Sequence, residues 1–322
     1  MARTDLIARA EDLRQARTPY VLATVVRAQR PTSAKPGDSA LILADGTLDG
    51  FVGGTCAEST VRLQGLRLLA TGASTLLRIT PDVPVEESVG SADEGLIVVN
   101  NPCLSGGSLE IFLEAIIPAP LLYVYGDAPV ARALVRIGAA AGYDMVTGSP
   151  DGMFELPGDT SAVVVASHGR GEEAVLEAAV AAKVPYVALV ASRKRGDVVL
   201  ASIGADRERV HSPAGLDLGA RSAADVAISI LAEIIAMRPA EPSMADGEAP
   251  ARVNAIAPDH AGVAADDPGR EAAVAVDPVC GMDVAITPNA IHAEHGGIDY
   301  YFCGSGCKVA FTADPHRYLT HD

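Results

Sequence analysis

Between residues 121 and 237 the chain alternates short apolar runs with helical patterns, and this alternation constrains the fold more than any other feature. The run Leu121-Leu122-Tyr123-Val124-Tyr125 ends at Gly126, and an Ala-rich helical segment follows to about residue 141. Further strand and helix patterns lie at 162–166, 172–182, 186–190 and 222–237. Such a series predicts βαβ units whose strands form one parallel sheet. We therefore expect a Rossmann-like domain over residues 119–238.

The composition agrees with a layered α/β protein and excludes several partners. The chain is 49% hydrophobic but only 4% aromatic, without Trp, so its cores must be built from aliphatic side chains. The net charge of −16 gives no field that would attract nucleic acid or an anionic membrane. No apolar run of about 18 residues is present, and charges interrupt residues 1–11. We expect a cytoplasmic protein without a membrane span.

The first 118 residues predict a mixed α/β domain. A helix is expected over 5–16, and strands over 20–26, 40–44, 48–52, 75–80, 96–99 and 109–113, with Asp45-Gly46 as a hairpin turn. Thr55 and Glu58 have the spacing of a capping box. This spacing predicts that a helix starts there, with Cys56 as its first helical residue.

Five cysteines, an odd and sparse number, argue against a disulfide framework and for thiol or metal roles. The free backbone N–H groups of a helix start favour a thiolate at Cys56. Gly53 and Gly54 would let a ligand or another chain approach closely. Cys103 lies in the turn-rich segment 100–107. Both cysteines could equally be small core or loop residues.

The predicted parallel sheet offers a second candidate site. Gly126 is the first glycine of a G-x-G-x-x-G fingerprint, but Ala128 and Pro129 depart from the pattern, so NAD(P) binding is not expected. Three cations follow the strand 186–190, at the edge where open sheets bind ligands: Arg193, Lys194 and Arg195. They form either a local anion site or a solvated charge run.

The C-terminal part differs in composition. Residues 239–276 are rich in Ala, Pro, Asp and Glu and predict a flexible acidic linker. Residues 277–322 form a small module with a C-x22-C-x3-C pattern made by Cys280, Cys303 and Cys307. Soft sulfur ligands suit zinc or copper, with His292, His295 or an exogenous group as the fourth ligand. Buried cysteines without metal are the alternative.

Several ordered stretches resemble a known family. They are Ala23-Thr24-Val25-Val26, Pro36-Gly37, Gly53-Gly54-Thr55-Cys56-Ala57-Glu58, and the segments 101–107, 185–195 and 213–221. Residues 13–237 are similar to the XdhC/CoxI family, accessory proteins of molybdenum hydroxylases such as xanthine dehydrogenase and carbon monoxide dehydrogenase. The tail, from Asp277-Pro278-Val279-Cys280 through Cys303-Gly304-Ser305-Gly306-Cys307, resembles a YHS domain, a module often associated with metals.

The resemblance implies a chaperone without turnover of its own. Such a protein binds the molybdenum cofactor (molybdopterin or its cytosine dinucleotide), supports its sulfuration with a cysteine desulfurase, and delivers it to an apo molybdenum hydroxylase. The resemblance to this family also implies a homodimer. The implied cofactor-binding residues are Cys56, Cys103, Gly53, Gly54, Glu58, Gly126, Arg193, Lys194 and Arg195. Two alternatives stay open: an NAD(P)-dependent oxidoreductase, and a metal-trafficking or metal-sensing protein that acts through the tail.

Overall fold

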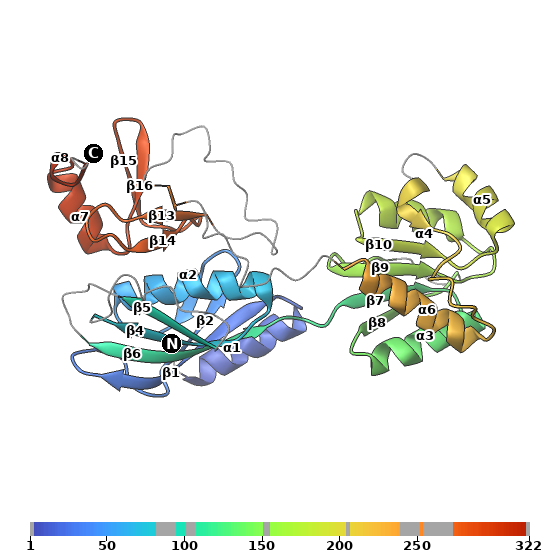
Figure 1. Cartoon of the computed structure of the whole chain (residues 1–322), viewed down its shortest axis with the longest axis horizontal. Helices are drawn as coiled ribbons and strands as arrows, with labels where there is room; N and C mark the ends of the chain where they lie inside the picture. Colours follow the sequence, from blue (N-terminus) through green and yellow to red (C-terminus); the bar gives the residue numbers. More distant parts are fainter. Residues whose placement is uncertain are drawn as a thin grey trace. The chain divides into compact units, whose positions relative to one another are not determined.

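The computed structural model describes residues 3–81, 95–100, 107–150, 155–203, 207–238, 252–253 and 273–319. They form three α/β parts, which Figure 1 colours along the chain. The first and third parts belong to one compact unit, residues 1–118 with 241–322, and residues 119–240 form another. Every helix described is too short or too polar to span a bilayer.

The N-terminal part is a six-stranded sheet with a helix on each face. Its elements are α1 (Arg3–Gln15), β1 (Tyr20–Gln29), β2 (Ser39–Leu43), β3 (Leu48–Gly50), α2 (Thr55–Thr71), β4 (Thr75–Thr80), β5 (Leu96–Asn100) and β6 (Ser108–Ile116). The strand order is β3-β2-β1-β6-β4-β5, and only β4 and β5 pair in parallel. Along β1 the side chains alternate: Tyr20 packs with α1, whereas Val21 packs in the cluster that contains α2.

The second part confirms the predicted Rossmann-like parallel sheet. Its elements are β7 (Leu121–Tyr125), α3 (Pro129–Ala140), β8 (Asp144–Gly148), β9 (Thr160–Val165), α4 (Glu172–Ala181), β10 (Tyr186–Leu189), α5 (Arg193–Ser202), β11 (Val210–His211) and α6 (Ala223–Ala236). The strands are parallel in the order β11-β10-β9-β7-β8. Residues of α3 and α6 share one core, and residues of α4 and α5 share the other. The chain therefore covers both faces of the sheet.

The third part contains strands and two short helices. They are β12 (Arg252–Val253), β13 (Val274–Val276), β14 (Asp283–Ala285), β15 (His292–His295), β16 (Ile298–Tyr301), α7 (Ser305–Ala313) and α8 (His316–Leu319). Its own core contains Tyr300, Phe302 and Phe311. The strands β12 and β13 fall within the segment 239–276 that the sequence predicts as linker; the rest of that segment, apart from residue 273, lies outside the described residues.

Helix α2 connects the third part to the first. One face of α2 packs on the six-stranded sheet, and Leu63 and Leu66 on another face pack against Val274 of β13 and Ala285 of β14. In Figure 1, α2 lies between the N-terminal sheet and β13–β14. Because α2 packs on the N-terminal sheet and also on β13 and β14, residues of both parts lie near its N-terminus.

Candidate functional site

The first turn of α2 carries Cys56, but the capping-box prediction is wrong. The N-cap is Gly54, which has an extended backbone, and no side chain caps the helix. The helix starts at Thr55. The first intrahelical bond runs from the Glu58 N–H to the Gly54 carbonyl, at 3.0 Å. Thr55 and Glu58 are thus one position too far into the helix to cap it. Cys56 becomes the second helical residue, still within the turn whose backbone N–H groups lack helical partners.

The two glycines before the helix have different environments. Gly53 has φ +144°, and a Cβ there would lie 3.1 Å from the Ala57 Cβ. A Cβ on Gly54 would meet nothing within 4 Å. Glycine is therefore required by packing and backbone at Gly53, whereas Gly54 leaves open space beside the helix start.

Glu58 lies half-buried one turn after Gly54. Burial raises the pKa of its carboxyl group, and the charge of Arg62 one turn further on opposes that rise. The Arg62 Nε in turn donates a 2.8 Å hydrogen bond to the Gly46 carbonyl. The Glu58 carboxyl is therefore partly desolvated and lies in the electrostatic field of Arg62.

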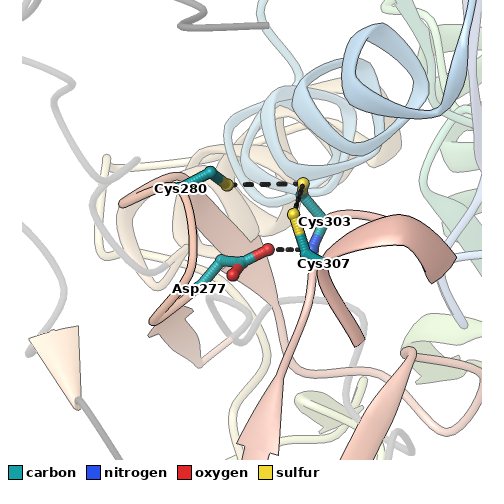
Figure 2. Close-up of side chains that lie close together, drawn as sticks. All are labelled: Asp277, Cys280, Cys303 and Cys307. Carbon is teal, nitrogen blue, oxygen red and sulfur yellow. Dashed lines mark hydrogen bonds between the residues drawn. The ribbon is translucent and has the colours of Figure 1, made fainter. Parts of the chain in front are cut away.

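The three cysteines of the tail come together, as Figure 2 shows. Cys280 lies between β13 and β14, Cys303 follows β16, and Cys307 is in the first turn of α7. The Cys280 Sγ lies 3.5 Å from the Cys303 Sγ, which lies 3.7 Å from the Cys307 Sγ. All three are free thiols. The sequence prediction of a shared thiol site in the tail is consistent with this geometry.

Asp277 is a member of the cluster that the sequence reasoning missed. Its fully buried carboxylate accepts hydrogen bonds from the backbone N–H of Val279, at 2.9 Å, and of Cys303, at 2.8 Å. One side chain thus fixes both the loop of Cys280 and the backbone of Cys303. The available signal was its position three residues before Cys280, because a polar residue close to a ligand in sequence can supply the hydrogen bonds that orient it.

The thiols have perturbed acidities. A hydrogen bond with Cys303 lowers the pKa of Cys280, and hydrogen bonds with Cys280 and Cys56 raise the pKa of Cys303. Burial raises the pKa of Cys307 to about 12. The arrangement therefore favours one thiolate, on Cys280, stabilised by a neighbouring S–H donor.

Cys56 of the N-terminal part lies against this cluster. It packs with Met282, Val284 and Cys303, and it is hydrogen-bonded to the Cys303 thiol. The adjacent backbones are also close, since a Cβ on Gly304 would lie 3.0 Å from the Thr55 Cγ2. The structure thereby joins two thiol sites that the sequence analysis treats as separate.

The histidines named as fourth ligands lie elsewhere. Among the described residues, the group of close metal-binding side chains is Asp277, Cys280, Cys303 and Cys307. The His292 Nδ1 is 3.1 Å from the Ala290 carbonyl, and the His295 ring packs edge-on against Phe311. Neither imidazole is directed to the thiols.

The predicted residues of the parallel sheet occupy its edge. Ser192 caps α5, whose first residues are Arg193 and Lys194, both exposed. The Arg195 guanidinium donates to both carboxylate oxygens of buried Glu172, at 2.8 and 3.0 Å. Gly126 has φ +111°, and a Cβ there would lie 2.3 Å from the Ala166 carbonyl oxygen, so packing alone requires glycine. Cys103 lies outside the described residues.

Known families match all three parts of the chain. Residues 13–80 match the XdhC and CoxI family, residues 122–234 match the XdhC Rossmann domain, and residues 275–322 match the YHS domain. The two XdhC matches together cover more than half of the chain.

Three curated proteins are similar to the chain. An uncharacterized protein of Escherichia coli, YqeB, is 23% identical over 264 residues, 73% of this chain, and the chain spans 46% of its length. The molybdenum cofactor insertion chaperone PaoD of Escherichia coli is 25% identical over 266 residues, 68% of this chain and 83% of PaoD. A copper-transporting P-type ATPase of Rhizobium leguminosarum is 42% identical over 48 residues, 15% of this chain and 6% of the ATPase.

A solved structure, that of a xanthine dehydrogenase from Bacillus halodurans, matches with a TM-score of 0.35 and 16% identity, covering 74% of this chain and 98% of that one. The family assignment depends on the domain matches, which follow one another along the chain in the order N-terminal domain, Rossmann domain and YHS domain. The chain therefore belongs to the XdhC and CoxI family and carries a YHS domain at its C-terminal end.

Proposed function

We propose that the protein is a molybdenum cofactor chaperone that supplies a molybdenum hydroxylase. The observation that carries this proposal is Cys56 in the first turn of α2, within the region matched to the XdhC and CoxI family. The similarity to PaoD, a molybdenum cofactor insertion chaperone, supports the same cargo. Molybdopterin or its cytosine dinucleotide is the cofactor form that we expect.

Cys56 has the chemistry that such a cargo needs. A thiolate in the first helical turn is stabilised by nearby backbone N–H groups and can bind molybdenum or carry a sulfur atom. The open space beside Gly54 leaves room for a ligand next to that turn. Sulfuration with a cysteine desulfurase and delivery to an apo-hydroxylase complete the proposed cycle, with Cys103 as the second thiol.

The Rossmann domain offers a candidate anion site of its own. Arg193 and Lys194 are exposed in the first turn of α5, where backbone N–H groups also favour anions. Arg195 is held by Glu172, whose buried carboxylate offsets its charge. Arg193 and Lys194 are therefore the residues of the Rossmann domain that we propose as anion contacts.

Cofactor retention tests the proposal. Purified protein is stripped of bound metal with a chelator and mixed with molybdenum cofactor under reducing conditions, free ligand is removed by gel filtration, and bound pterin is measured as its fluorescent oxidation product. We expect near-stoichiometric pterin on the wild type and a loss of at least about tenfold for Cys56→Ser, since the variant lacks the thiolate.

Two further measurements make the result decisive. Ser59→Ala, one turn further along α2, is the matched control and should retain pterin. An NADH titration that saturates while pterin does not bind would replace the chaperone by the NAD(P)-dependent oxidoreductase. Equal amounts of pterin on wild type and Cys56→Ser would show that the Cys56 thiol does not bind the cargo. Arg193 and Lys194 would then be the residues to test next.

A second function, metal binding by the tail, is favoured by the three thiols. Their Sγ atoms are 3.5 and 3.7 Å apart beside buried Asp277, and soft thiolates select zinc or copper. The similarity to a copper-transporting ATPase is in keeping with such a role. Elemental analysis of protein purified under reducing conditions should give about one metal ion per chain, and Cys280→Ser should remove it.

A further inference from the structure

We propose that Cys56 is the fourth ligand of the tail's metal site, so that one zinc ion is held between the N-terminal domain and the YHS domain. The other three ligands are Cys280, Cys303 and Cys307. This inference depends on the tail metal site proposed above, and it can be tested without the molybdenum cargo. It assigns a ligand to the site from outside the YHS domain.

The spacing of the thiols matches a tetrahedral ion. Thiolates bound about 2.3 Å from zinc in a tetrahedron lie about 3.8 Å from one another. The observed Sγ separations are 3.5 Å between Cys280 and Cys303 and 3.7 Å between Cys303 and Cys307. Two of the three separations among the tail thiols thus match such a tetrahedron, and the third lies within 4.8 Å. A closed structural site needs a fourth ligand.

The packing of α2 brings Cys56 against the thiol cluster. Cys56, Ser59, Leu63 and Leu66 have the spacing i, i+3, i+7, i+10, which places them on one face of the helix. Leu63 and Leu66 on that face are buried against β13 and β14. The same face therefore brings the Cys56 thiol against Cys303, to which it is hydrogen-bonded.

Asp277 is the other candidate for the fourth ligand, because a carboxylate oxygen lies within 4.8 Å of all three tail sulfurs and the carboxylate is hydrogen-bonded to the Cys280 and Cys307 thiols. Its backbone contacts favour a positioning role instead. Its two carboxylate oxygens accept the backbone N–H groups of Val279 and Cys303. These bonds position two segments that carry thiols, as an orienting carboxylate does in many metal sites. A carboxylate oxygen is also a harder ligand than a thiolate sulfur and therefore suits a soft ion less well.

The electrostatics favour a site of four thiolates. Cys56 is the second residue of α2, and Cys307 is the third residue of α7, so two helix N-termini converge on the cluster. Their partial positive charge stabilises the excess negative charge of four thiolates around a divalent ion. Binding exchanges thiol protons for the metal, with the protons released to solvent and no change in oxidation state.

Cobalt(II) is the probe for the test, because thiolate-to-cobalt charge-transfer absorption grows with the number of sulfur ligands. The full-length reduced apoprotein is titrated with Co²⁺ and then with Zn²⁺ in competition. For wild type we expect a tetrahedral spectrum with one ion per chain. For Cys56→Ser we expect about a quarter less charge-transfer intensity, and zinc affinity at least about tenfold weaker.

Two variants serve as controls. Cys103→Ser removes the remaining cysteine and should leave spectrum and affinity unchanged. Asp277→Asn should weaken affinity by about 10–100-fold while the intensity per bound ion stays at the four-thiolate level. Circular dichroism of each variant verifies that it is folded.

The outcomes separate this inference from the tail site itself. A wild-type spectrum unchanged by Cys56→Ser overturns the shared site and leaves a metal site of the tail alone. Loss of a quarter of the intensity in Cys103→Ser instead of Cys56→Ser overturns it as well. Failure of wild type to bind Co²⁺ or Zn²⁺ overturns both the shared site and the tail site, without bearing on pterin binding.

Discussion

At the scale of single residues, Glu172 and Arg195 illustrate how a predicted ligand can have a structural partner. The Glu172 carboxylate is fully buried and accepts hydrogen bonds from Arg195, from the Gly169 N–H at 2.8 Å and from the Ser167 hydroxyl at 3.1 Å. A buried carboxylate needs such partners. The strand-edge position of Arg195 was predictable from sequence, but its partner was not, because Glu172 belongs to a different βαβ unit.

Glu172→Gln should destabilise the Rossmann domain by about 2 kcal/mol at pH 7. Removal of one member of a fully buried pair costs about 3–5 kcal/mol, and we expect less because the Arg195 side chain is 36% exposed and remains partly solvated. Urea unfolding measures the difference. Exposed Glu173 on the same helix provides the control Glu173→Gln, which should change stability by less than about 0.5 kcal/mol.

The same variant should alter the pH dependence. Burial alone would raise the pKa of Glu172, but the hydrogen bonds from Arg195, Gly169 and Ser167 outweigh it and hold the pKa below its ordinary value of 4.5. The stabilisation from this carboxylate is therefore complete above about pH 4.5 and is lost as the pH falls through the folded-state pKa. Wild type and Glu172→Gln should converge in stability in acid; a constant difference at all pH values would contradict this assignment.

At the scale of elements, α2 marks the limit of what the sequence predicts. The strand 75–80, the hairpin at Asp45-Gly46 and the βαβ series follow from apolar patterns and turn residues, and the structure contains them. The predicted start of α2 was one residue too late. Gly54 is the N-cap because of its backbone conformation, and the spacing of Thr55 and Glu58 contains no information about that conformation.

The docking of the tail on α2 was also not predicted. Its only local signal is that apolar residues of α2 occupy two faces, with Val61 and Leu68 on one and Leu63 and Leu66 on the other. A helix that is apolar on more than one face is buried on more than one side. Sequence patterns do not identify what covers the second face, and here the partner strands lie about 200 residues further along the chain.

Leu66→Ala should loosen the tail on α2. Deletion of buried methyl groups typically costs about 2–5 kcal/mol, and a cost of about 2 kcal/mol corresponds to about thirtyfold faster amide exchange in β13 and β14 where local opening governs exchange. Hydrogen exchange followed by mass spectrometry measures this. Leu68→Ala on the opposite face is the control and should affect mainly the N-terminal sheet. Unchanged exchange in β13 and β14 for Leu66→Ala would contradict the docking.

At the scale of the whole molecule, two proposed roles depend on the same thiol. Cys56 is the proposed contact to molybdenum cofactor and also the proposed fourth ligand for zinc. One sulfur atom cannot fill a closed four-thiolate zinc site and bind cargo at the same time. The net charge of −16 adds a field that attracts cations to the molecule. Metal availability would thereby regulate how much protein can accept cofactor.

Zinc loading should therefore mask Cys56. We expect alkylation of Cys56 by iodoacetamide, measured by peptide mass spectrometry, to slow by at least about tenfold when one equivalent of zinc is bound, because a metal-bound thiolate is a weaker nucleophile and is less accessible. Cys103 in the same digest is the internal reference and should react at one rate in both samples.

Pterin retention should fall in parallel with Cys56 reactivity, and a chelator should restore both. Equal alkylation of Cys56 in the apoprotein and in protein with zinc demonstrably bound would contradict this prediction. Cys56 would then not be a zinc ligand, and it could bind cofactor at all metal concentrations.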